Sequence, residues 1–153
     1  MNLKIKHLEM IEAVAERMAK NSFTIKGWTM GLVSIVGVLA SQNSDKRFLL
    51  VILLPAIIFL GLDAYYLLLE RKYRFLYKKV SKLDEEDIDF DMDCNSISID
   101  GIDAKKICFF NCLLSPTEIC FYLPIIVGIL FKLILYLIFD YPHKHYTFKY
   151  FEV

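Results

Sequence analysis

The fold is decided by residues 48–83, which read FLLVILLPAIIFLGLDAYYLLLERKYRFLYKKVSKL. The first part, residues 48–69, is almost entirely apolar, and the part that follows is basic and aromatic. A helix rises about 1.5 Å per residue, so the apolar part reaches about 33 Å and can cross a hydrocarbon core of roughly 30 Å. Residues 70–83 contain no proline or glycine that would break a helix. We therefore predict a transmembrane helix that continues beyond the membrane as a basic stalk, over residues 48–83.

Two further apolar runs flank this stretch, at residues 23–40 and 119–139. The whole chain of 153 residues is 56% hydrophobic, and its mean hydropathy of +0.44 is too high for an ordinary soluble domain. The predicted fold class is an all-α membrane protein with three transmembrane helices.

The third transmembrane helix has a clear start signal. Ser115 is a typical N-cap residue, Pro116 suits the first helical position, and Glu118 completes a capping box. We expect this helix over residues 116–139, followed by a short, aromatic external tail at 140–153.

Residues 1–22 predict an amphipathic helix that precedes the first span at 23–40. Leu8, Ile11 and Met18 lie at helical spacing, opposite a face of mixed charge. This helix could lie on the bilayer or pack on other cytoplasmic helices, and the mixed charge favours packing. A signal peptide is disfavoured, because a secretory n-region is short and basic, whereas three glutamates precede this apolar run.

The distribution of basic residues predicts the orientation. Thirteen lysines and arginines lie before the first span, with Lys26 at its start counted among them, or between the second and third spans, against four in the other loop and the tail. The positive-inside rule therefore places the N-terminus in the cytoplasm and the C-terminus outside, in a bacterial inner membrane.

Residues 84–115 form the acidic cytoplasmic segment of this layout. Ile88, Phe90 and Met92 alternate with aspartates, and Ile97 and Ile99 alternate beyond them, which predicts a short two-stranded β-ribbon. The four cysteines lie in or beside this segment, where thiols stay reduced, and we expect them to be small buried hydrophobes.

The sequence contains no nucleophile elbow, P-loop, metal-helix motif or glycine-rich dinucleotide loop. The three histidines are far from the cysteines in sequence, which argues against a zinc site. We expect no catalytic residue, no metal and no cofactor.

Two ionisable residues, Asp63 and Lys132, lie deep inside predicted spans, where a charge is costly. Their predicted depths differ by about 11 Å, so a direct salt bridge within one protomer is not expected. Lys132 can extend its side chain to the headgroups. Asp63 is too short for this, so it must bond a neighbouring helix, face water in a pore, or be neutral.

The first span contains small and polar residues at helical spacing. Gly27 and Gly31 predict close packing of another helix, although this motif is common by chance. Thr24 and Ser34 are candidates for lining a conduit, with helix packing as the alternative.

The stalk sequence RKYRFLYKK, residues 71–79, has the composition of a single-strand nucleic-acid site, because cations follow phosphates and aromatic rings stack on bases. The same composition is typical of a membrane anchor. However, Lys78 lies about 14 Å beyond Leu69, out of easy headgroup reach. The candidate ligand contacts are Arg71, Arg74, Lys78 and Lys79 for phosphates and Tyr73 and Tyr77 for stacking.

Two stretches, HLEMIEAVAERMAKNSFTIKGW (residues 7–28) and FLGLDAYYLLLERKYRFLY (residues 59–77), resemble small bacterial membrane proteins of antiphage defence operons. The resemblance is strongest to the membrane channel subunit of the Hailong system and covers about the first 80 residues of the chain.

This resemblance implies a homo-oligomeric channel, with a tetramer as one candidate state. It also implies that an oligodeoxyadenylate made by a partner nucleotidyltransferase keeps the channel closed, and that loss of this ligand depolarises the cell in abortive infection. The alternatives are a pore that a nucleotide opens, or a non-channel accessory or scaffold subunit that docks a protein.

Overall fold

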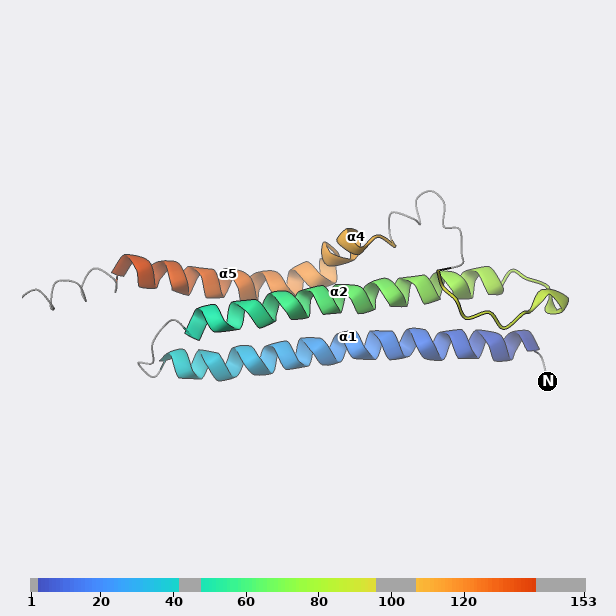
Figure 1. Cartoon of the computed structure of the whole chain (residues 1–153), viewed down its shortest axis with the longest axis horizontal. Coiled ribbons are helices and arrows are strands. Elements are labelled where there is room, and N and C mark those ends of the chain that lie inside the picture. Colours follow the sequence, from blue (N-terminus) through green and yellow to red (C-terminus); the bar gives the residue numbers. More distant parts are fainter. Residues whose placement is uncertain (1–2, 42–47, 96–106, 140–153) are drawn as a thin grey trace, which may run out of the picture.

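The computed structural model describes residues 3–41, 48–95 and 107–139 of the chain (Figure 1). Its helices, in chain order, are α1 (Leu3–Ser41), α2 (Phe48–Val80), the 3-10 turn η1 (Glu85–Asp87), α4 (Phe109–Leu113) and α5 (Pro116–Phe139).

The three long helices lie in a row, with α2 between α1 and α5 (Figure 1). α1 and α2 form a long antiparallel hairpin, and α5 lies along the part of α2 nearer to Phe48 (Figure 1). All three contain stretches that are long and apolar enough to cross a membrane, within Leu3–Leu39, Ile52–Val80 and Pro116–Leu135. The prediction of a mostly helical protein with three membrane-spanning helices is confirmed by length and composition.

α1 is a single helix in the structure, whereas the sequence predicted an amphipathic helix at 1–22 followed by a span at 23–40. It contains 39 residues, or about 58 Å, and is therefore much longer than a bilayer core is thick. α2 is equally continuous across residue 69 and ends at Val80, three residues before the predicted end. Both helices therefore extend well beyond a membrane.

Outside the predicted spans at 23–40 and 48–69, the hairpin of α1 and α2 has its own apolar core. Ile11 of α1 is buried against Leu76 and Val80 of α2. Half-buried Ile88 and Met92, from the segment after α2, pack on the same cluster. The apolar stripe of α1 thus finds its partner inside the chain, on another helix.

The segment 84–95, which we call the acidic strap, folds back along this end of the hairpin. Lys4 Nζ donates to the carbonyl of Leu83 at 2.7 Å, and the ring of buried His7 lies 3.1 Å from the carbonyl oxygen of Asp91. At the far end of the strap, Lys72 Nζ donates to Asn95 Oδ1 at 2.7 Å. These contacts fix the strap to both helices.

The predicted β-ribbon is not confirmed, because residues 84–95, the part of it that the structure describes, contain no strand. Asp89 and Asp91 each accept a hydrogen bond from the backbone N–H two residues later, and Asp93 does the same for Asn95. Aspartates in such local bonds replace ladder bonds with turns. Phe90, at φ 57°, also leaves the extended region. Ile97 and Ile99 lie outside the described residues.

Candidate functional site

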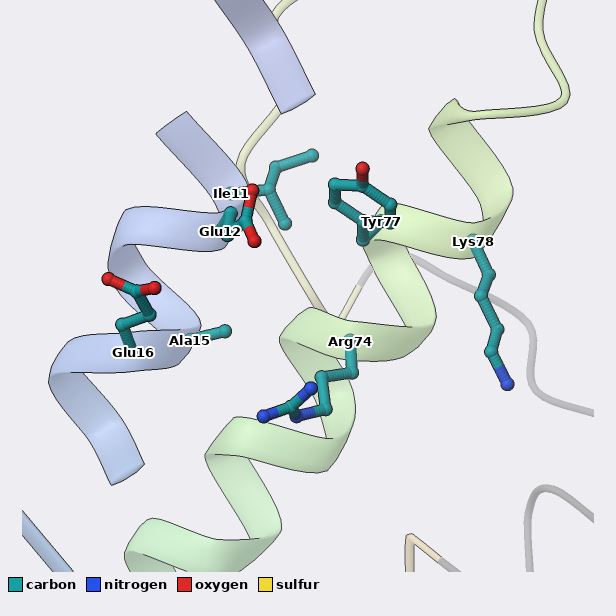
Figure 2. Close-up of a pocket in the computed structure, with 7 residues that line it drawn as sticks. All are labelled: Ile11, Glu12, Ala15, Glu16, Arg74, Tyr77 and Lys78. Atoms are coloured by element: carbon teal, nitrogen blue, oxygen red, sulfur yellow. The ribbon is translucent and has the colours of Figure 1, made fainter. Parts of the chain in front are cut away.

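A hollow between α1 and α2 lies outside the predicted spans at 23–40 and 48–69, and we call it the groove. It has a volume of about 600 Å³ (Figure 2). α1 contributes two apolar and two acidic side chains, and α2 contributes an aromatic and two basic ones. The lining residues are Ile11, Glu12, Ala15, Glu16, Arg74, Tyr77 and Lys78.

The two walls of the groove carry opposite charges. Arg74 and Lys78 on α2 are exposed, and so are Glu12 and Glu16 on α1 (Figure 2). Arg74 also pairs along its own helix with Glu70, at 2.7 Å between Nε and Oε1. An anionic ligand is therefore attracted to the α2 wall and repelled by the α1 wall, so the groove selects where a phosphate can sit.

The groove brings together three of the six predicted ligand contacts, namely Arg74, Tyr77 and Lys78. Arg71 lies less than one turn before Arg74 along α2, beside Cys112 of α4. Tyr73 is half-buried on the apolar core of the hairpin. Lys79 is exposed but does not line the groove. The helical repeat places these three side chains on other faces of α2.

A second group of functional side chains lies where the three long helices meet, and we call it the polar cluster. Its members are Ser22 and Lys26 on α1, Asp63 on α2, and Glu118 and Tyr122 on α5. Lys26 Nζ forms salt bridges with Asp63 and, at 2.9 Å, with Glu118 Oε1. Both carboxylates are almost fully buried, at 0% and 1% exposure. The cluster therefore binds all three spans to one another through charge.

The donors of the polar cluster are shared unequally between its two carboxyl groups. Asp63 accepts hydrogen bonds from the Ser22 hydroxyl, from Lys26 and, at 3.1 Å, from the Tyr122 hydroxyl. Glu118 accepts only from Lys26, and its Oε2 is buried without a hydrogen-bond partner among the described residues. The Lys26 ammonium also lies 5.9 Å from the centre of the Phe121 ring.

This geometry settles how Asp63 is accommodated in a single chain. Its side chain bonds neighbouring helices, which is one of the options that the sequence left open. Lys132 is exposed on α5 and is not a member of the cluster. The sequence argued against a salt bridge between Asp63 and Lys132, and in the structure Asp63 pairs with Lys26.

The remaining predicted residues of the first span face outward in the single chain. Thr24 and Ser34 are exposed, and each hydroxyl donates to the carbonyl four residues earlier, at 2.9 and 2.8 Å. Such a bond gives the hydroxyl a hydrogen-bond partner within its own helix, so it does not need the water of a pore. Gly27 and Gly31 are exposed too, and a Cβ added at either would meet nothing within 4 Å. Their predicted packing role therefore concerns a neighbouring molecule.

Lys26 and Glu118 were not among the predicted site residues. Lys26 entered the sequence argument only as one of the basic residues that set orientation, and Glu118 only as a capping residue. Both lie in membrane-length helices, where an ionisable residue signals a partner or a function. That signal was available, but the ion pairs of Lys26 with Asp63 and with Glu118 join residues 37 and 92 positions apart.

The α4 turn carries Cys112, which is buried, whereas Cys108 is exposed. Burial raises the pKa of the Cys112 thiol, and the neighbouring Arg71 opposes this effect only in part. No group of three or more metal-ligating side chains comes together within residues 3–41, 48–95 and 107–139.

No family model, no curated protein and no solved structure matches this chain. The resemblance to antiphage membrane effectors therefore stays a prediction from the two stretches that carry it.

Proposed function

We propose that this protein is a membrane effector of antiphage defence, whose copies assemble into an ion channel that a nucleic-acid-like ligand keeps closed. The proposed ligand is an oligodeoxyadenylate made by a partner nucleotidyltransferase, and its loss depolarises the cell. In this proposal the protein lies in the bacterial inner membrane, with the groove in the cytoplasm and the C-terminus outside.

The observation that carries the proposal is the continuity of α1 and α2. Both helices line the groove, and both run without interruption from there into stretches of membrane length. A ligand that prefers one arrangement of the two helices at the groove therefore favours the same arrangement within the bilayer. It shifts the population of states only by its difference in affinity for them.

Two features support assembly of several copies. Three helices in a row cannot surround a conduit, so conduction requires association (Figure 1). The open approach at Gly27 and Gly31 also allows a helix of a second copy to come close.

The test is ion leak from liposomes that contain the purified protein, measured with and without short oligodeoxyadenylates. We expect leak that the oligomer suppresses. Leak that appears only when a nucleotide is added would reverse the sign of gating. No leak from folded, oligomeric protein under either condition would contradict the channel.

A second candidate function is a non-channel accessory subunit that docks a protein. The observation that favours it is the opposite charge of the two groove walls, since a peptide with both signs of charge complements Glu12 and Glu16 as well as Arg74 and Lys78. Absence of leak together with retained partner binding would select this function.

A further inference from the structure

The polar cluster contains more acidic than basic groups. If both carboxyl groups were ionised, Asp63 and Glu118 would face the single ammonium of Lys26 and leave one negative charge buried among three helices. A buried uncompensated charge is strongly unfavourable, and the usual outcome is that one group becomes neutral.

A bound metal cation would not neutralise this charge well. The ammonium of Lys26 already occupies the position between the two carboxyl groups, where a cation would have to bind. The remaining groups that face Glu118 and Asp63 are Ser22 on α1, Tyr122 on α5 and, further off, the Cys112 thiol on α4. Hydroxyl and thiol groups add no positive charge, which leaves a proton.

We infer that Glu118 carries this proton at neutral pH, so that the polar cluster is a proton-binding site with zero net charge. Asp63 accepts three hydrogen bonds, which stabilise its ionised form. Glu118 accepts one, and its unpartnered Oε2 is the oxygen that a proton suits best. A buried neutral hydroxyl without a partner is far less costly than a buried carboxylate oxygen without one.

Release of the proton follows from simple acid dissociation. At alkaline pH the O–H bond of Glu118 breaks, the proton passes to hydroxide to form water, and the carboxylate keeps the electron pair. The cluster then gains a net negative charge between α5 and the hairpin, so their contact weakens. The folded chain holds a proton that the unfolded chain releases, so the stability from this group is present at low pH and is lost as the pH rises.

The test is the infrared carbonyl stretching band of a protonated carboxylic acid, which ionised carboxylates lack, recorded at neutral pH on the full chain in lipid. We expect this band in the wild type, a shift of the band when glutamate carboxyl carbons are ¹³C-labelled but not when aspartate carbons are, and its loss in Glu118→Gln. Glu70→Gln is the matched control and should keep the band, because Glu70 forms an ion pair with Arg74.

The inference does not depend on the proposed channel, and three results would overturn it: no such band at neutral pH, a shift on aspartate labelling, or a band that survives in Glu118→Gln. If Glu118→Gln does not fold, the isotope labels in the wild type still decide the question. We also expect the melting temperature of the wild type to fall more with rising pH than that of Glu118→Gln. Equal falls would contradict the proton site.

Discussion

The groove and the polar cluster are both built from α1 and α2, and both hold carboxylates and basic groups, yet their environments differ. In the groove, Glu12, Arg74 and Lys78 are exposed. In the polar cluster, Asp63 and Glu118 are buried and linked across helices by Lys26. Exposed charges remain available for a ligand and add little to stability, whereas buried charges depend on one another. Substitutions in the groove should therefore change ligand binding more than stability, whereas substitutions in the polar cluster should mainly change stability.

The largest effect should come from Lys26→Met, which removes the only cation of the polar cluster. It leaves ionised Asp63 buried without its ammonium, and breaking a buried pair in this way costs about 3–5 kcal/mol. Denaturant or thermal unfolding in detergent measures this loss. Lys132→Met is the matched control, since Lys132 is an exposed lysine of a predicted span, and it should be close to neutral. Equal losses in the two variants would show that the cluster has no special role.

The next effect separates the groove from the rest of the basic stalk. Lys78→Glu should weaken binding of a short oligodeoxyadenylate roughly 10- to 100-fold, because a hydrogen bond to a charged group contributes about 1.5–3 kcal/mol. Fluorescence anisotropy with a labelled oligomer measures the affinity.

Lys79→Glu provides the control for this experiment, because it makes the same charge change at the next residue, which is exposed but does not line the groove. Equal weakening by the two variants would indicate that the ligand follows general positive charge and not the groove.

A smaller effect of opposite sign is expected on the α1 wall. Glu12→Gln and Glu16→Gln together should tighten oligonucleotide binding roughly 2- to 30-fold, since removal of each exposed carboxylate contributes about 0.2–1 kcal/mol. For a protein ligand with both signs of charge, the same variant should weaken binding, so the direction of the change separates the two candidate functions.

The smallest effect concerns a thiol beside the hairpin. Burial raises the pKa of Cys112, so less of its reactive thiolate form exists near neutral pH than for an ordinary cysteine. Single-cysteine variants treated with maleimide should label more slowly at Cys112 than at exposed Cys108, with a gap that narrows as the pH rises. Mass spectrometry measures the rates, and faster labelling at Cys112 would contradict its burial.

Sequence patterns predicted the features that depend on local composition. The length of the apolar runs was enough for the three spans, and Ser115-Pro116 marked the residue where α5 begins. The sequence divided residues 1–40 at position 23, where the apolar run begins, and the structure has one continuous helix across this point, in which the Ser22 hydroxyl donates to Asp63.

The sites were predicted less completely for a related reason. The groove requires knowledge of which face of α2 meets α1, so only Arg74, Tyr77 and Lys78 of the predicted set line it. The partners of Asp63 come from two other helices, α1 and α5, and no local pattern encodes which of their residues share a level in the membrane.

The place of Lys26 along α1 has a mechanical consequence. Ile11 in the groove and Ser41 at the end of α1 are each 15 residues from Lys26, or about 22 Å along the axis. If the salt bridges hold this point, α1 is a lever with equal arms, and a sideways step of the groove end is matched by a step of the same size in the opposite direction at the other end. A pivot at Lys26 neither amplifies nor damps the movement, so the size of the displacement at the Ser41 end is set entirely by what occupies the groove.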